Sequence, residues 1–283
     1  MATKNNNLHN AKRQKNDEFY TTRATVELEV NHYKEHFRGK VVYCNCDDPI
    51  ESEFTRYFAY KFEDWGLKKL ISTGYKESGH GVMYIYEGDK NGNLVPDRSE
   101  WKITELQGNG DFRSEECIEF LKEADVVVTN PPFSLFREVV AQLVEYNKKF
   151  LLLGNNNAIT YKEIFPLIMS NKMWLGYSNN KTMEFVLSDS YEKWDRIENG
   201  KKIGKVPAIS WFTNLEHDHR NKPLVLTKRY DPRYYPKFDN YSAINIDKVM
   251  DIPVDYEVEK IVTEEELNKL KEQGFIIEII EEY

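Results

Sequence analysis

The sequence has no long apolar run and no apolar segment near its start. Its 283 residues are 40% hydrophobic and 13% aromatic, which is typical of a folded chain, whereas a membrane-spanning helix needs about 20 consecutive apolar residues. The start is rich in Asn and Lys and lacks the apolar core of a signal peptide. We therefore expect a cytoplasmic protein with no membrane partner.

Cysteine is scarce. Cys44, Cys46 and Cys117 are the whole set, and a small odd number argues against a disulfide framework. The Cys-x-Cys spacing is too tight for an ordinary structural zinc half-site, and no histidine pair lies near it in the sequence. We expect reduced thiols and no metal site.

A basic excess, which would favour nucleic-acid binding, is also missing, since the net charge is −8. The imbalance lies in residues 251–283, which hold eleven acidic and three basic side chains. The rest of the chain is neutral overall. Because patches and not totals set the local field, the net charge neither supports nor excludes a nucleic-acid partner.

Glycine is missing from the first turn of an apparent α/β unit. Residues 40–46 read as a buried strand and residues 52–65 as a helix. The Asp-Asp-Pro turn between them has no Gly-x-Gly, although glycine normally lets the backbone approach a ligand closely. The pattern predicts an α/β fold with an atypical ligand loop.

The stretch that organises the chain covers residues 124–134. Four β-favouring residues precede Asn130 and predict a short buried strand. Pro131 and Pro132 fix φ and lack an N–H, so the loop is stiff and offers carbonyl and amide oxygens as acceptors. Phe133 could lay its ring against a flat group. The pattern fits an acceptor pair for a substrate amine, and it also fits a proline-stiffened turn.

Three further segments, taken with this Asn-Pro-Pro-Phe loop, resemble one family. They are Asn-Asp-Glu-Phe-Tyr-Thr at 16–21, Cys-Asp-Asp-Pro-Ile-Glu-Ser-Glu-Phe at 46–54 and Gly-Asn-Gly-Asp-Phe-Arg-Ser at 108–114. Over roughly residues 14–256 the chain resembles the EcoRI-type adenine-specific DNA methyltransferases. The resemblance implies a doubly wound, Rossmann-like α/β sheet, S-adenosylmethionine as cofactor, and adenine N6 in a specific duplex DNA site as methyl acceptor.

The resemblance also assigns site residues. The catalytic loop is Asn130, Pro131, Pro132 and Phe133. Cofactor contacts are expected from Phe19, Tyr20, Thr21, Cys46, Asp47, Asp48, Pro49, Glu77, Asp111 and Phe112. Of these, Tyr20 and Thr21 would lie at the methionine end, Glu77 at the ribose hydroxyls, and Asp111 with Phe112 at the adenine. The same segments also fit plain turns, a solvated loop charge and a helix cap.

The expected organisation has four regions. They are a flexible basic arm (1–16), a cofactor-binding catalytic core (17–170), the remaining core strands with a less regular target-recognition region (171–250), and an acidic helix-strand tail (251–283). Residues 82–106 read as an inserted β-hairpin with an Asn-Gly turn. Later strands are expected at 172–177, 184–187, 207–212 and 224–226, and a basic loop at 199–205.

The implied chemistry orients an amine. If Asn130 and Pro131 accept its two N–H bonds, the lone pair is drawn out of the adenine ring plane, and the flipped base can stack on Phe133. Cytosine N4, RNA or a glutamine amide would suit the same loop. A degenerate relative that binds DNA or protein is a further alternative. The resemblance also admits a cognate restriction endonuclease that forms no stable complex with the chain.

Overall fold

The computed structural model describes residues 19–46, 48–179, 181–188, 191, 193–223, 225–237 and 244–256. The chain forms two compact units, residues 1–220 and 221–283. Both sheets lie in the first unit. No helix within the described ranges is long and apolar enough to cross a bilayer.

An eight-stranded sheet forms the centre of the first unit, in the order β5-β4-β3-β2-β6-β7-β12-β8. Its four middle strands are parallel and the two at each end are antiparallel to their neighbours. The bounds are β2 Val41–Cys44, β3 Lys69–Gly74, β4 Val82–Tyr86, β5 Trp101–Glu105, β6 Val126–Thr129, β7 Lys149–Asn155, β8 Trp174–Leu175 and β12 Ile209–Thr213. The predicted Rossmann-like α/β fold is confirmed.

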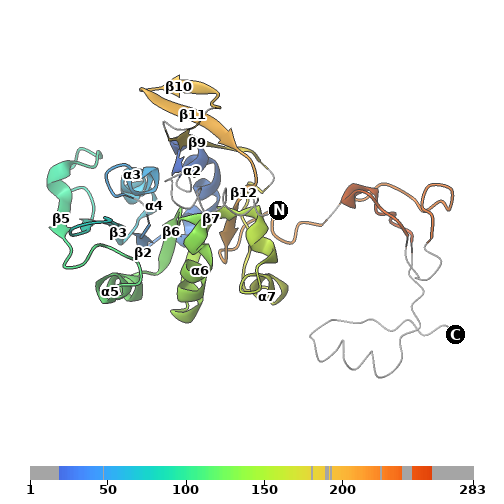
Figure 1. The fold of residues 1–283 in the computed structure, drawn as a ribbon, viewed down its shortest axis with the longest axis horizontal. Coiled ribbons are helices and arrows are strands. Elements are labelled where there is room, and N and C mark those ends of the chain that lie inside the picture. Colours follow the sequence, from blue (N-terminus) through green and yellow to red (C-terminus); the bar gives the residue numbers. More distant parts are fainter. Residues whose placement is uncertain are drawn as a thin grey trace, which may run out of the picture. The chain divides into compact units, whose positions relative to one another are not determined.

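Helices cover both faces of this sheet (Figure 1). One face carries α2 (Arg23–Val30), α3 (Glu53–Tyr60) and α4 (Phe62–Trp65), and the other carries α5 (Glu115–Glu123), α6 (Phe136–Glu145) and α7 (Phe165–Met169). All four residues of β2 and of β6 are buried, as expected for parallel strands covered on both sides. Short 3-10 helices lie at Asn31–His36, Arg98–Glu100, Phe133–Leu135, Asn156–Thr160 and Val249–Asp251.

A second, antiparallel sheet has the order β1-β9-β11-β10. Its strands are β1 Tyr20–Thr21, β9 Met183–Leu187, β10 Arg196–Glu198 and β11 Lys201–Val206. The prediction of a loop at 199–205 was wrong, because Asn199 and Gly200 are the two-residue connection of a hairpin. Their φ values of 49° and 76° are both positive, as a type I′ turn requires.

The predicted hairpin at 82–106 exists as β4 and β5, and it forms an edge of the central sheet. Its Asn-Gly step does not make a tight turn, because only Gly92 of that pair has a positive φ. Side chains close the longer loop instead: Asp89 accepts the amides of Asn91 and Gly92, and buried Glu100 accepts that of Lys90.

Other expectations differ in extent. The strand expected at 172–177 shortens to β8, and residues 225–226 of the strand expected at 224–226 are not in a strand. The basic arm at 1–16 and the helix and strand predicted in the tail lie outside the described residues. Strands that follow residue 170 pair with earlier ones, β12 with β7 and β9 with β1. The boundary at 170 stays a prediction.

Candidate active site

The two predicted loops meet at the carboxyl edge of the central sheet. β2 lies between β3 and β6, so the strand order reverses beside β2, and such switch points are where open α/β sheets bind ligands. The backbone amide of Cys46, beyond β2, donates a 3.2 Å hydrogen bond to the Thr129 hydroxyl at the end of β6. This contact joins the turn after β2 to the Asn-Pro-Pro-Phe loop.

Asn130 follows Thr129 and is partly buried. Its Nδ2 donates a 2.6 Å hydrogen bond to the backbone carbonyl of Phe19. Because a carbonyl can only accept, this bond fixes which end of the amide is nitrogen. Oδ1 is buried and has no hydrogen-bond partner among the described residues. The asparagine therefore presents an acceptor.

The two prolines after Asn130 have different surroundings. The Pro132 carbonyl accepts a 2.8 Å bond from the Leu135 amide, which starts the 3-10 helix at Phe133. Pro131 is buried, and no backbone amide in the described ranges outside regular helices and strands donates to its carbonyl. The loop thus carries a second acceptor next to the first.

Aromatic rings form one wall beside the loop. The half-buried ring of Phe133 lies 6.4 Å from that of Phe19, centroid to centroid. The Phe19 ring in turn lies 6.0 Å from Phe185 on β9 and 5.7 Å from Tyr191. Phe185 and Tyr191 were not predicted, since nothing local in the sequence marks them as neighbours of residue 19.

The Phe-Tyr-Thr segment reaches the site through β1. Tyr20 pairs with Val186 and Thr21 with Phe185. The side chain of Tyr20 is 43% exposed. The hydroxyl oxygen of Thr21, in contrast, is buried and has no partner among the described residues. Like the oxygen of Asn130, it is a buried polar atom in the predicted site to which no described residue offers a hydrogen bond.

The turn after β2 is closed without a Gly-x-Gly. The Asp48 carboxylate accepts the amides of Ile50, at 2.8 Å, and Glu51, at 3.2 Å. Pro49 is buried against the end of β3, where a Cβ added to Gly74 would lie 2.6 Å from its Cδ. The glycine that permits close packing is thus on the neighbouring strand. Asp47 lies outside the described residues.

Two more glycines complete this packing. Gly110, at φ 81°, lies so close to β3 that a Cβ on it would come within 2.4 Å of the Gly74 carbonyl oxygen. A Cβ on Gly81 would meet the Gly110 backbone at 2.7 Å. The loop that carries Asp111 is therefore fixed against β3 by backbone contact, a packing role of its glycines that the sequence did not predict.

Asp111 and Phe112 have structural partners already. Arg113 donates to both carboxylate oxygens of Asp111, through its backbone amide and Nε to Oδ1 and through its guanidinium to Oδ2. These bonds lower the pKa of the Asp111 carboxyl. Phe112 is 6% exposed and packs in the core. One lone pair of Oδ2 is left for a ligand.

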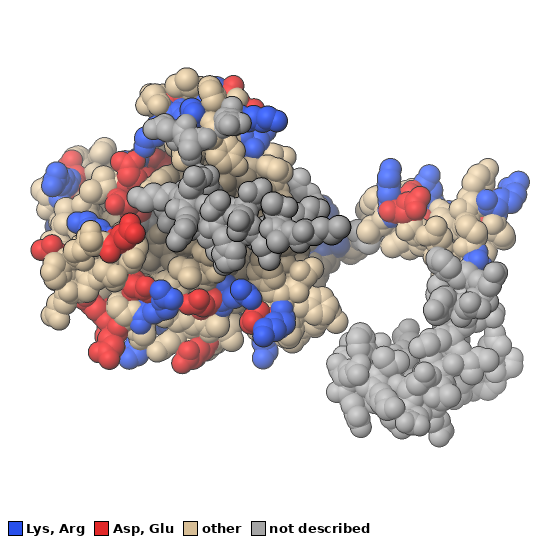
Figure 2. All heavy atoms as spheres, viewed as in Figure 1, with Lys and Arg blue, Asp and Glu red and all other residues tan. Residues whose placement is uncertain are grey.

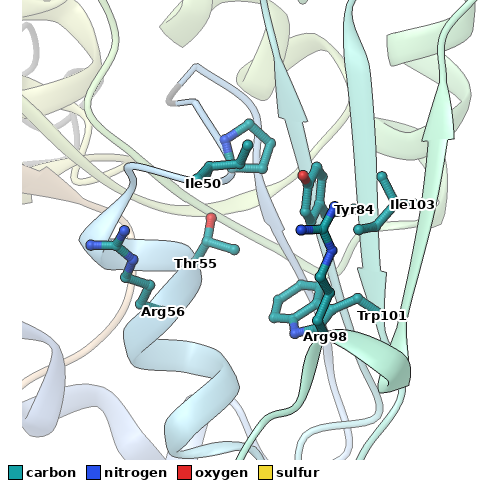
Figure 3. A pocket seen from close by; sticks show the side chains of 8 residues that line it. Ile50, Thr55, Arg56, Tyr84, Arg98, Trp101 and Ile103 are labelled. Atoms are coloured by element: carbon teal, nitrogen blue, oxygen red, sulfur yellow. The ribbon is translucent and has the colours of Figure 1, made fainter.

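The last two features are Glu77 and a cavity beside Pro49. Glu77 is exposed in the loop after β3. A cavity of about 280 Å³ opens beside Pro49, between α3 and the β4–β5 hairpin (Figure 3). Pro49 is the one predicted site residue among those that line it; the others are Ile50, Thr55, Arg56, Tyr84, Arg98, Trp101 and Ile103. Asn130 is therefore not among the residues that line this cavity.

The structure thus joins Cys46 to the end of β6 and Asn130 to Phe19 through hydrogen bonds, and Thr21 follows Phe19 in β1, paired with β9. Thr129 belongs with them and was missed, because a strand-end threonine carries no special sequence signal. Within the described ranges there is no group of three or more His, Cys, Asp or Glu that could hold a metal ion.

Comparisons with known proteins identify the family of the chain. A family model described as adenine-specific methyltransferase EcoRI matches residues 7–282. The type II methyltransferase M.EcoRI of Escherichia coli is 47% identical over 266 residues, which cover 88% of this chain and 81% of that protein. No solved structure was found to match the chain.

Two mycoplasma proteins are also similar. The type II methyltransferases M.MgeORF184P of Mycoplasma genitalium and M.MpnI of Mycoplasma pneumoniae are each 40% identical to the chain, over 258 and 257 residues. The aligned parts cover 88% of this chain in both cases, and 78% and 77% of the two proteins. The similarity therefore extends across most of each chain.

Proposed function

Because the chain belongs to the EcoRI family of adenine-specific methyltransferases, we propose that Asn130 and Pro131 hold the target amine while it accepts a methyl group. The chain is a DNA adenine methyltransferase. The observation that carries the site assignment is the bond from Asn130 Nδ2 to the Phe19 carbonyl, which leaves Oδ1 as a buried acceptor.

Two acceptors are what this reaction needs. The N6 lone pair of adenine is delocalised into the ring, so the amine is a weak nucleophile. When Asn130 Oδ1 and the Pro131 carbonyl each accept one N–H, the nitrogen is turned so that its lone pair leaves the ring plane. As the new N–C bond forms, the C–S bond of the sulfonium would break and a neutral thioether would leave. The methylated amine is then strongly acidic and can lose its extra proton to water, so no general base with a shifted pKa is needed. Positioning of this kind can supply ~7–11 kcal/mol.

The target base must leave the duplex to reach these acceptors. Phe133 follows them directly, and its half-buried ring faces Phe19 at 6.4 Å. An aromatic ring beside the acceptors suits a stacked purine, because base–aromatic stacking is favourable for every base. We assign Phe133 as the stacking platform for the flipped adenine.

S-adenosylmethionine supplies an electrophilic methyl group on a sulfonium. The Thr21 hydroxyl is buried and has no hydrogen-bond partner in the part of the chain that the structure describes, which supports a ligand at this position. With Phe19 and Tyr20 it would hold the methionine end. The turn after β2, which consists of Cys46, Asp47, Asp48 and Pro49, would contact the cofactor as well. Glu77 is exposed and available for ribose hydroxyls, and Asp111 retains one acceptor site for the adenine amine, beside Phe112.

Duplex DNA is the proposed substrate, and the cytoplasm, where bacterial DNA lies, is the proposed location. The relatives are named type II methyltransferases, which supports a place in a restriction-modification system. A cognate endonuclease would then recognise the same DNA site without forming a stable complex with this chain.

The test compares the purified wild type with Asn130→Ala. We expect wild-type protein to form N6-methyladenine in duplex DNA, identified by mass spectrometry, and the variant to lose transfer while calorimetry shows nearly unchanged S-adenosylmethionine binding. Asn155→Ala is the control, because Asn155 also ends a strand but its Oδ1 already accepts the Asn157 amide. Loss of transfer and cofactor binding together would make Asn130 structural. N4-methylcytosine or a methylated RNA or protein as sole product would contradict the assigned substrate.

A further inference from the structure

The hairpin of β10 and β11 is connected to the catalytic loop through the strands of the smaller sheet. β10 is the edge strand of the smaller sheet, and β1 is its other edge. Residue 19, directly before β1, holds the Asn130 side chain. In Figure 1 the hairpin stands beyond β9, on the side of the central sheet that carries α2 and α3. A ligand on β10 would therefore be connected to Asn130 through three strand pairings.

Basic side chains predominate on this hairpin. They are Arg196, Lys201, Lys202 and Lys205, together with Lys193 just before β10, against Glu198 and, just before β10, Asp195. Figure 2 shows Lys and Arg side chains on both sides of the hairpin, with a few acidic atoms between them, and a mixture of basic and acidic side chains around α5 and α6. The hairpin is thus a local basic element on a chain whose net charge is negative.

Several of these charges can take another partner. No described residue lies within ion-pair distance of the side chain of Lys193 or of Lys205. Arg196 is the direct ion-pair partner of Glu184 and lowers the pKa of that carboxyl, and Lys205, which stands opposite Glu184 in the β9–β11 pairing, helps to lower it. Lys201 pairs with Glu51 at 2.6 Å, but both side chains are about half exposed, at 56% and 46%. Such exposed pairs contribute about 0–1 kcal/mol, so a phosphate can replace Glu51. Arg196, in contrast, is held by Glu184 and Glu198.

The hairpin also exposes apolar surface. Ile197 in β10 is 65% exposed, and Trp194, two residues before the start of β10, is 44% exposed. Ile197 lies opposite Lys202, whose Nζ is 4.2 Å from the centroid of the Trp194 ring. A β-ribbon with lysines and one uncovered aliphatic side chain matches the duplex grooves, where base edges lie between two rows of phosphates.

We propose that the β10–β11 hairpin enters a groove of the duplex next to the target adenine. Lys193 and Lys205 bind phosphates, Lys201 joins them when it leaves Glu51, and Ile197 contacts base edges. The proposal rests on the proposed function for its ligand, duplex DNA. It assigns to the catalytic unit a DNA contact separate from residues 221–283.

The test measures binding of a fluorescent duplex by anisotropy over a series of salt concentrations. Each phosphate contact contributes about 0.9 to the slope of log K against log salt. The double variant Lys193→Ala/Lys205→Ala should therefore lower the slope by about 2 and weaken binding at least tenfold at moderate salt, with unchanged S-adenosylmethionine affinity. Lys102→Ala is the control: Lys102 is an exposed strand lysine of β5 at the far edge of the central sheet, and its loss should change neither quantity.

Ile197→Ala separates apolar contact from charge. It should weaken DNA binding several-fold and leave the salt slope unchanged, because it removes no cation.

The proposal is overturned if the double lysine variant keeps the salt slope and the DNA affinity of the wild type. Circular dichroism checks folding, and Lys193→Gln/Lys205→Gln replaces any variant that unfolds. A wild type that binds duplex DNA without methylating it would contradict the proposed function alone, and the lysine variants would still decide on the hairpin. A wild type that binds no duplex would overturn both.

Discussion

The side-chain nitrogen of Asn130 lies 2.6 Å from the backbone carbonyl oxygen of Phe19 and donates a hydrogen bond to it. The bond joins positions 111 residues apart. Because the partner is a backbone atom, the orientation of the Asn130 amide depends on the path of the chain before β1 and not on which side chain is present at position 19.

This geometry distinguishes Asn130→Asp from an ordinary conservative change. An ionised aspartate has no donor for the Phe19 carbonyl, and two oxygens would repel each other at this distance. We expect methyl transfer to fall on the order of a hundredfold or more, despite the similar shape. The rate should be measured from pH 5 to 8, because protonation restores a donor and should recover part of it. A wild-type rate at pH 8 would contradict the role of this hydrogen bond.

A pair of glycine variants tests the backbone contact beneath Asp111. Gly110 and Gly92 both have positive φ, at 81° and 78°, but a Cβ on Gly110 would lie 2.4 Å from the Gly74 oxygen, whereas nothing lies within 4 Å of one on Gly92. Gly92→Ala should cost roughly 1–2 kcal/mol for the left-handed backbone. Gly110→Ala should cost clearly more and weaken S-adenosylmethionine binding. Urea unfolding and calorimetry measure both, and equal losses would show that the loop relaxes.

Glu29 is expected to be essential for folding of the first unit. Its carboxylate is fully buried and accepts bonds from the Tyr33 hydroxyl, the Tyr177 and Ser178 amides and the Ser178 hydroxyl. Glu29→Ala leaves these donors unsatisfied, each at a cost of about 1–3 kcal/mol, so the variant should be strongly destabilised in urea. Glu35→Ala, at an exposed position of the following 3-10 helix, should be nearly neutral. A small effect at Glu29 would mean that water replaces the carboxylate.

The ion pair of Arg113 with Asp111 predicts a pH dependence. Arg113 holds the pKa of the Asp111 carboxyl below its ordinary value of 3.8, so the folded state binds the proton less tightly than the unfolded state. The pair therefore stabilises the fold fully above about pH 4, and this contribution is lost as the pH falls through the lowered pKa. Arg113→Met should reduce the free energy of unfolding at pH 7, and its difference from wild type should shrink towards pH 3. A difference independent of pH would assign the effect to packing.

Local signals were sufficient for much of the fold. The apolar runs that became β2, β6 and β7 are continuous because both faces of a parallel strand are covered. Ser114 caps α5 and accepts the Cys117 amide at 3.2 Å, a local contact that a serine before a helix predicts, because capping needs atoms only three residues apart. The stiffness of the loop after Asn130 follows from its two prolines alone.

The tertiary structure decided what depends on distant partners. Of the three Asn-Gly steps in the chain, only the one at 199–200 makes a tight two-residue hairpin, because β11 is paired on its other side with β9. The one at 91–92 lies in a loop closed by Asp89 and Glu100, and the one at 109–110 lies in the loop packed against β3. A two-residue strand such as β1 has no local signal and exists through its pairing. The sequence by itself thus determined the acceptor loop and the sheet that carries it. The orientation of the Asn130 amide, and the partners that Arg113 gives to Asp111, arise only when the folded chain brings these groups within hydrogen-bond distance.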